Sequence, residues 1–237
     1  MLHFILLESA LELVPPELTS LKAIQKHAGR RNKKPGELLL DQSFHGQAMT
    51  RLEDGEKRGR PDIPFFSLQS ILETPLCKSG LMSIHLHLQD SRIVKVHPNV
   101  RLPRNYDRFV GLIEQLLAEG RVPPTGEPLL EIIRGNLMNL VDELRDGHSN
   151  TLTLLAVESG QRTPMKELLE LLPESSDVPV IIGVGMFPHG DFSSATRTAF
   201  QTAIELDKEV MMGWHVCSEI LWTYTLKHHV IRTRYEL

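Results

Sequence analysis

Short, almost wholly apolar runs alternate with longer amphipathic segments along this chain of 237 residues. Residues 2–7, 151–157 and 180–184 are rich in Leu, Ile and Val, which is the pattern of strands buried on both faces of a sheet. Because amphipathic segments separate these runs, we expect an α/β fold with a mostly parallel sheet. The spacing predicts helices at residues 17–29, 63–73, 105–119, 164–172 and 210–228.

Several shorter segments complete this pattern. Residues 81–89 and 92–96 alternate in polarity around Asp90-Ser91, which predicts a β-hairpin. Residues 37–40 are a candidate strand, a helix is expected through residues 49–52, and residues 197–206 fit neither type. Since the hairpin interrupts the alternation, we expect a single domain over residues 1–237 with an inserted elaboration at residues 77–100.

Composition narrows the class of protein. A hydrophobic content of 41% and a charged content of 24% are ordinary for a soluble globular protein. The two cysteines, Cys77 and Cys217, offer neither a disulfide framework nor metal-binding spacing, which suits a reducing cytosol. The apolar opening lacks a basic leader, and no apolar run approaches the ~18 residues that cross a bilayer. We therefore expect a cytoplasmic protein that does not enter the membrane.

The net charge of −4 conceals two basic segments. Residues 22–60 hold ten Lys and Arg against five Asp and Glu, and residues 92–108 hold five against one. Basic segments on an otherwise acidic chain indicate a surface for a polyanion. In the alternative interpretation, the positive charges lie on separate solvated helix faces and form no common surface.

The second basic segment contains a regular arginine motif. Arg101, Arg104 and Arg108 lie three and four residues apart beside Asn105, a residue that favours the N-cap of a helix. Arginine forks next to the free amides of a helix start form a good phosphate site. Arginines could also flank a helix start by chance.

A charged turn ends the first basic segment, with the sequence Arg58-Gly-Arg60-Pro-Asp62-Ile63. Pro61 fixes its own φ and restricts Arg60, so the side chains of Arg60 and Asp62 should be held in place. In the alternative interpretation this is an ordinary turn, and Asp62 is the N-cap of the next helix.

A glycine-rich turn follows the predicted strand at residues 180–184. Gly183, Gly185, Pro188 and Gly190 would let the backbone approach a ligand at the carboxyl end of that strand. Neither a phosphate loop nor a dinucleotide fingerprint is present, so the turn predicts a small-molecule pocket built from the C-terminal third, or else an ordinary loop. In the segment that follows, Met211, Trp214 and Leu221 are better explained by core packing than by ligand binding.

Taken in their order along the whole chain, these motifs resemble those of one family. The motifs are Arg60-Pro-Asp62-Ile63, Val100-Arg101-Leu-Pro103-Arg104-Asn-Tyr-Asp-Arg108-Phe109 and Gly183-Val-Gly-Met-Phe-Pro-His-Gly-Asp-Phe192. They are similar to those of the ribosome-biogenesis pseudouridine N1-methyltransferases of the SPOUT class, in their shorter archaeal form. The arginine motif is the most specific of the three. The chain departs from the family at Pro64-Phe65, where members often place a histidine.

The resemblance implies a SPOUT-type α/β knot, with a C-terminal trefoil knot that binds S-adenosylmethionine, and a homodimer formed through the closing helices. It implies small-subunit ribosomal RNA as substrate, at a pseudouridine in a hairpin loop, with ribosomal proteins as partners during assembly. It assigns RNA binding to Arg60, Arg101, Arg104 and Arg108. The cofactor residues implied are Leu154, Gly183, Pro188, His189, Gly190, Leu206, Asp207, Lys208, Glu209, Val210 and Met211.

The implied chemistry needs no metal, because the methyl group of a sulfonium is already electrophilic. The enzyme must align nitrogen, methyl carbon and sulfur, and must help a weakly acidic N–H to become nucleophilic. Asp62 is the first candidate for the catalytic group and His189 the second. Two other functions stay open, namely a non-catalytic RNA-binding ribosome-assembly protein and a related methyltransferase acting on transfer RNA or on an unmodified base.

Overall fold

The computed structural model describes residues 1–235, and these form one eight-stranded sheet in the order β4-β5-β3-β2-β1-β7-β6-β8. The strands are β1 (Leu2–Ser9), β2 (Met82–Leu88), β3 (Ile93–Val96), β4 (Arg121–Val122), β5 (Leu130–Ile133), β6 (Leu152–Arg162), β7 (Val180–Gly185) and β8 (Thr202–Glu205). Strands β2, β1, β7, β6 and β8 run parallel to their neighbours in this order. The pairs of β2 with β3, β3 with β5 and β4 with β5 are antiparallel. The prediction of a mostly parallel sheet is confirmed, and so is the hairpin, which is β2 and β3.

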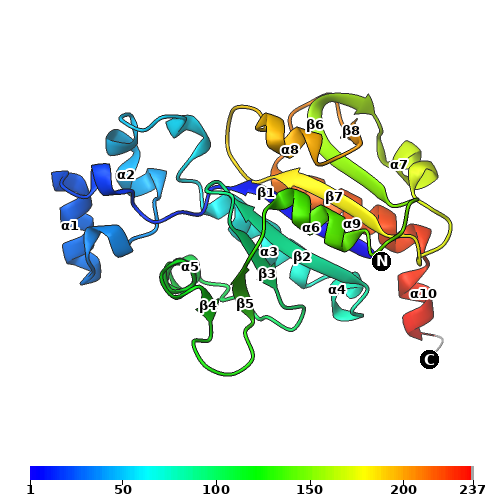
Figure 1. Ribbon diagram of the computed structural model, residues 1–237, viewed down its shortest axis with the longest axis horizontal. Helices are drawn as coiled ribbons and strands as arrows, with labels where there is room; N and C mark the ends of the chain where they lie inside the picture. Colours follow the sequence, from blue (N-terminus) through cyan, green and yellow to red (C-terminus); the bar gives the residue numbers. More distant parts are fainter. Residues whose placement is uncertain (236–237) are drawn as a thin grey trace.

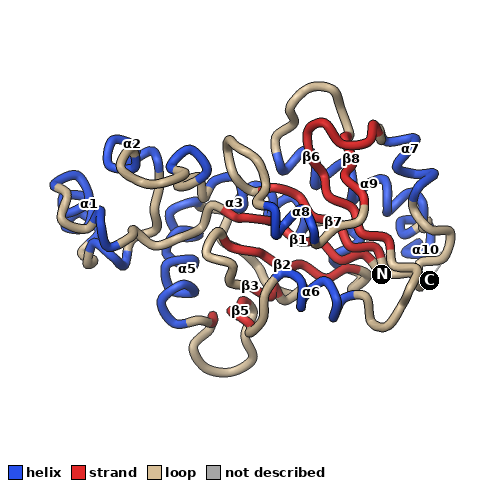
Figure 2. The backbone as a smooth tube through the Cα atoms, turned by 45° about the horizontal axis from the view of Figure 1, so that its top comes forward, coloured by secondary structure: helices blue, strands red, loops and turns tan. Residues whose placement is uncertain are grey.

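Helices cover both faces of the sheet (Figures 1 and 2). On one face, α3 (Asp62–Leu72), α5 (Tyr106–Glu119) and α9 (Gly213–Lys227) pack on the larger core, together with α4 (Pro75–Lys78), α7 (Met165–Leu171) and α10 (Val230–Tyr235). On the other face, α6 (Leu137–Leu144) and the segment after α8 (Ser194–Thr198) cover a smaller core. Both faces of β1 and β7 are therefore buried, which explains why these strands are apolar without alternation.

A small helical lobe lies beside the sheet, at the left of Figure 1. It contains α1 (Lys22–Arg31) and α2 (Gln42–Met49), with the short 3₁₀ turns η1 (Pro16–Leu18), η2 (Pro35–Glu37) and η3 (Gly55–Lys57). Its own core of nine buried apolar residues is separate from the two cores of the sheet. The buried carboxylate of Glu114 on α5 ties the lobe to the sheet, because it accepts bonds from Arg31 at 3.1 Å, Lys33 at 2.6 Å and the Leu39 N–H at 3.0 Å.

The local patterns predicted most element types correctly. Asn105 is the N-cap of α5 and accepts a hydrogen bond from the Arg108 N–H, as expected. Residues 37–40 form no strand, so that prediction was wrong; Leu38 and Leu40 instead fill the core of the lobe. The first helix begins at Lys22 and the closing helix at Gly213, in both cases later than predicted, since a 3₁₀ turn precedes one and a loop precedes the other. Helix α6 and strands β4 and β5 were not predicted.

Within residues 1–235, none of the helices combines the length and the apolar character that crossing a bilayer requires.

Candidate functional site

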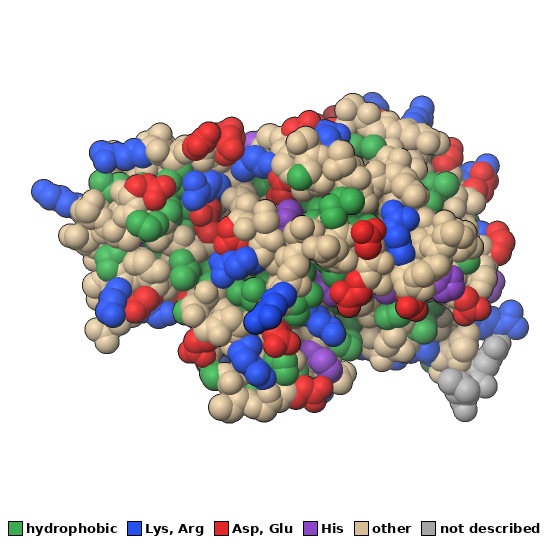
Figure 3. All heavy atoms as spheres, in the orientation of Figure 1, with side chains coloured by type: hydrophobic (Ala, Val, Ile, Leu, Met, Phe, Trp, Pro, Cys, Tyr) green, Lys and Arg blue, Asp and Glu red, His purple; other side chains and the backbone are tan. Residues whose placement is uncertain are grey.

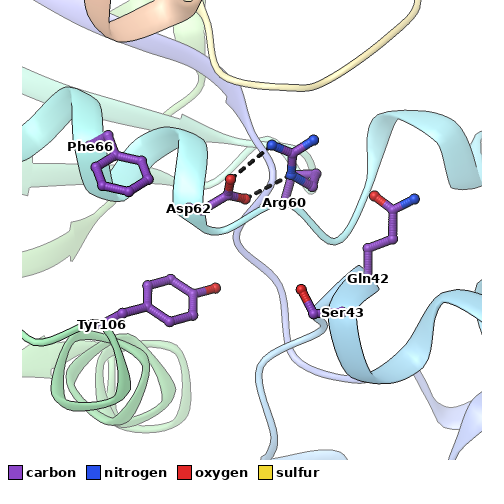
Figure 4. A pocket seen from close by; sticks show the side chains of 6 residues that line it. All are labelled: Gln42, Ser43, Arg60, Asp62, Phe66 and Tyr106. Atoms are coloured by element: carbon purple, nitrogen blue, oxygen red, sulfur yellow. Dashed lines mark hydrogen bonds and ion pairs between the residues drawn. The ribbon is translucent and has the colours of Figure 1, made fainter.

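A cavity of about 560 Å³ opens where the lobe meets the sheet. Three helices and one turn supply its walls, and Figure 4 shows their side chains around the opening. The lining residues are Gln42, Ser43, Arg60, Asp62, Phe66 and Tyr106. Sequence reasoning identified only Arg60 and Asp62, because the others come from segments that local patterns do not connect.

Arg60 and Asp62 form a planar, two-bonded ion pair inside this cavity. The guanidinium donates from Nε to Oδ1 and from Nη2 to Oδ2, both at 2.8 Å (Figure 4). Pro61, not Asp62, is the N-cap residue of α3, so the alternative interpretation of Asp62 as an N-cap is wrong. The hydrogen bonds from Arg60 to Asp62 raise the pKa of Arg60. Each side chain therefore orients the other toward the opening.

Tyr106 forms the opposite wall and is held by the lobe. Its hydroxyl donates to Asp41 Oδ2 at 2.7 Å, while Asp41 Oδ1 accepts the Ser43 N–H at 2.8 Å and so caps α2. Burial and the bond to Asp41 raise the pKa of Tyr106. His45 accepts the Asp41 N–H at 3.1 Å, and burial lowers the pKa of His45 to about 4. The Asp41 carboxylate thus ties the start of α2 to α5, while the neutral His45 fixes the backbone of Asp41.

Phe66 leaves nearly half of its side chain exposed to the cavity, although it is a large apolar residue. It lies four residues after Asp62, on the same side of α3. Its ring meets Trp214 in an edge-on contact, with ring centroids 5.3 Å apart. Trp214 is in the first turn of α9, directly after the segment 206–212. The cavity wall therefore contacts a residue three positions after Met211, the last of the predicted cofactor residues.

The three arginines of the arginine motif, Arg101, Arg104 and Arg108, lie in a segment next to α3. Gln69 on α3 donates to the carbonyl of Pro103 at 2.9 Å, which holds this segment against the helix. The side chains of Arg101, Arg104 and Arg108 are exposed and make no hydrogen bond or ion pair within residues 1–235. One amide of the helix start, that of Arg108, is already taken by the Asn105 side chain. Figure 3 shows Lys and Arg side chains over the lobe and the region of α5 and β5, with acidic side chains among them.

The segments implied to bind the cofactor lie close together. Strands β6, β7 and β8 are adjacent and parallel, so their carboxyl ends meet at one edge of the sheet. The glycine turn, residues 186–193, follows β7, and the loop 206–212 follows β8. A Cβ atom on Gly213 would lie 3.3 Å from the carbonyl oxygen of Gly185, which shows how closely these backbones approach.

Two of the predicted cofactor positions serve the core. Leu154 is fully buried, and a Cβ on Gly183 would lie 2.4 Å from Leu7 Cδ1 and 2.6 Å from Phe200 Cζ. A valine at Gly183 would disturb this packing before it could report on cofactor binding. Gly190 has a φ of +90°, a conformation that favours glycine.

The remaining positions have varied exposure. Leu206 is buried, whereas Pro188 and Met211 are half-buried. Exposed side chains at the same edge of the sheet are His189, Asp207, Lys208, Glu209 and Val210. Met211, Trp214 and Leu221 pack against the larger core, as the sequence predicted.

Comparison with known proteins identifies the family. A family model described as EMG1/NEP1 methyltransferase matches residues 4–225. The ribosomal RNA small subunit methyltransferase Nep1 of Staphylothermus marinus is 42% identical over 93% of this chain and 93% of its own. Its namesake from Saccharolobus solfataricus is 45% identical over 81% of this chain and 82% of its own. The crystal structure of Archaeoglobus fulgidus Nep1 bound to S-adenosylhomocysteine superposes with a TM-score of 0.83 at 35% identity, covering 96% of this chain and 98% of that one. Since these matches span almost the whole chain, the protein belongs to the EMG1/NEP1 methyltransferase family and has the SPOUT-type fold of that family.

Proposed function

We propose that this protein transfers a methyl group from S-adenosylmethionine to N1 of a pseudouridine in small-subunit ribosomal RNA. The name of its relatives supports the RNA substrate, and the solved relative binds S-adenosylhomocysteine, the product that S-adenosylmethionine leaves after methyl transfer. One observation in this chain carries the proposal: Phe66 of the Arg60–Asp62 cavity contacts Trp214, next to the segment between β8 and α9. The side chains proposed to bind the substrate are therefore close to the segments proposed to bind the cofactor.

The cofactor segments fit a ligand that needs close backbone approach. A side chain on Gly213 would be tightly placed against the Gly185 carbonyl, and Gly190 has a backbone conformation that favours glycine. The residues that would hold the cofactor are Pro188, His189, Gly190 and the segment Leu206 to Met211, whereas the predicted positions Leu154 and Gly183 serve the core. When bound, S-adenosylmethionine supplies a methyl group that its sulfonium makes electrophilic. We further propose that these loops form a trefoil knot and that residues 1–237 act as one domain, elaborated at residues 77–100.

The chain's own residues would bind and orient the target nucleotide. Arg101, Arg104 and Arg108 have free guanidinium groups for phosphates of a hairpin loop. Phe66 offers an exposed ring face on which an unpaired base can stack. Asp62 keeps acceptor capacity on both oxygens beside its bonds to Arg60, so it can accept the N1–H of that base. A loop base is already unstacked in part, which lowers the cost of flipping it into the cavity.

The experiment that tests this function compares two RNA hairpins of identical sequence, one with pseudouridine and one with uridine at the target. Mass analysis after incubation with protein and labelled S-adenosylmethionine should show one added methyl group on the pseudouridine hairpin alone. Methylation of the uridine hairpin, or of transfer RNA instead, would favour the related methyltransferase. Binding of RNA without any methylation would favour the non-catalytic assembly protein.

We also propose a homodimer through the C-terminal third, with ribosomal proteins as further partners during assembly. Leu221 is buried within the protomer, so the interface would use Trp222 and Leu226, whose side chains on α9 are 50% and 60% exposed. A biological interface should bury at least ~1,000 Å². Light scattering at micromolar protein should report a dimer, and Trp222→Asp should convert it to a folded monomer. A wild-type protein that is monomeric under these conditions would contradict the proposal.

A further inference from the structure

A half-buried lysine, Lys57, joins two segments that are far apart in the sequence. Its ammonium group donates to Glu8 Oε2 at 2.6 Å and to the carbonyl of Asp191 at 2.7 Å. The other oxygen of Glu8 accepts the Ser193 N–H at 2.9 Å. Glu8 is the second-last residue of β1, while Asp191 and Ser193 belong to the glycine turn, residues 186–193. The pair therefore fastens this turn to the central strand of the sheet.

The glycine turn is shaped around the lysine side chain. The ammonium group lies 4.4 Å from the centroid of the Phe187 ring, which is the geometry of a cation–π contact. A Cβ on Gly190 would lie 3.1 Å from Lys57 Cγ, so a larger residue there would press on the lysine stem. Lys57 thus contacts the turn at three places, namely Phe187, Gly190 and Asp191.

The ion pair is largely shielded from solvent, and removing two charges from water costs free energy. The side chains of Lys57 and Glu8 are only 17% and 7% exposed, and Glu8 adopts a left-handed φ of +47°. Burial alone would raise the pKa of Glu8, but the bonds from Lys57 and Ser193 outweigh it and lower that pKa. A buried pair contributes little to stability by itself, so positioning is the role that its contacts support.

The same lysine begins the turn that leads to the cavity. Gln89 donates to the Lys57 carbonyl at 2.5 Å, and Arg58 binds Glu12 with two hydrogen bonds at 2.7 and 2.5 Å. These bonds fix the backbone directly before Gly59 and Arg60. Lys57 therefore contacts the glycine turn through its side chain and is joined to Arg60 through the backbone of residues 58–60.

We propose that Lys57 is a positioning residue that holds the glycine turn in its cofactor-binding shape and couples it to the Arg60–Asp62 cavity. The inference rests on the proposed function, because it takes the glycine turn as part of the cofactor site. Loss of the lysine should weaken cofactor binding although Lys57 donates its own bonds only to protein groups. Since coupling between two sites is reciprocal, the loss should also reduce the effect of cofactor on RNA affinity.

The test compares Lys57→Met with Lys78→Met, which removes an equally short but exposed ion pair to Glu73, 2.6 Å long. We expect calorimetry to show S-adenosylhomocysteine binding weakened about 10-fold or more by Lys57→Met, the loss of an interaction worth at least 1.4 kcal/mol, and unchanged by Lys78→Met. RNA affinity without cofactor should stay at the wild-type value in Lys57→Met. Any increase in RNA affinity caused by cofactor should shrink in Lys57→Met alone.

The outcomes separate this inference from the proposed function. If the wild-type protein bound no S-adenosylhomocysteine, the proposed function would be wrong and the inference with it. If the wild-type protein bound it and a folded Lys57→Met bound it equally well, only the inference would be overturned. Should Lys57→Met fail to fold, Glu8→Gln would serve instead, because it removes the charge and keeps an acceptor for the Ser193 N–H. Cofactor affinity in that variant should fall in the same direction, and wild-type affinity would again overturn the inference.

Discussion

Replacement of Asp62 by alanine is expected to slow methyl transfer about 100-fold or more, the range of a positioned acid or base, with a much smaller loss of RNA affinity. The carboxylate accepts two hydrogen bonds from Arg60 and faces the cavity that would receive the base. An interaction that matters mainly in the transition state lowers the rate constant of the chemical step more than it lowers binding. Cofactor affinity should stay unchanged, because Asp62 lies outside the glycine turn and the loop 206–212.

Single-turnover rates at saturating cofactor and RNA measure this effect directly. Asp62→Asn is the matched control, since an amide retains one acceptor for Arg60 but takes up a proton far less readily. If proton acceptance is the role of Asp62, the asparagine variant should be nearly as slow as the alanine variant. An alanine variant with full activity and weakened RNA binding would make Asp62 only a structural brace for Arg60.

Simultaneous replacement of Arg101, Arg104 and Arg108 by alanine should remove most of the RNA affinity. Each arginine that neutralises one phosphate contributes about one unit or less to the slope of log K against log salt, so the triple variant should lose up to about three units. The guanidinium groups are exposed and make no bond within residues 1–235, so their removal should leave the fold intact. Affinity for S-adenosylhomocysteine should not change.

Fluorescence anisotropy of a labelled hairpin, titrated at several salt concentrations, gives these slopes. Lys166→Ala is the control, because it also removes an exposed cation, but one far from the arginine motif. Lys166 lies on α7, which follows β6, whereas α5 contacts β4 at the opposite end of the sheet. Its slope should equal that of the wild-type protein. Wild-type RNA binding in the triple variant would mean that the basic segments are solvated faces, and the ribosomal substrate would then rest on family membership alone.

The local patterns that predicted elements correctly all report burial or capping. Strands β1, β6 and β7 were found because central strands of a parallel sheet are covered on both faces, and few residue types other than Val, Ile and Leu suit that position. The start of α5 was found because the Asn105 side chain satisfies a backbone amide only three residues away. Such signals are contained within a few residues, and the sequence alone therefore carries them.

The same local reasoning failed where a distant segment decides the role of a residue. The apolar run 37–40 could be a strand or part of a helical core, and only the position of α1 and α2 makes it the latter. Gly183 belongs to a glycine-rich pattern, yet its missing side chain is required by Leu7 and Phe200, which are distant in the sequence. Asp62 was a candidate N-cap in the local pattern, but it is the first residue of α3 and its carboxylate binds Arg60.

By itself, then, the sequence determined the fold class, the family resemblance and the two turns that carry Arg60, Asp62 and Gly190. Only the tertiary structure decided that Phe66 and Tyr106 share a cavity with Arg60 and Asp62, and that Lys57 joins β1 to the glycine turn. The physical reason is the order of the strands. β1 lies between β2 and β7, so the ends of segments that are far apart in the chain become neighbours at one edge of the sheet, and no local spacing records which of their side chains will meet.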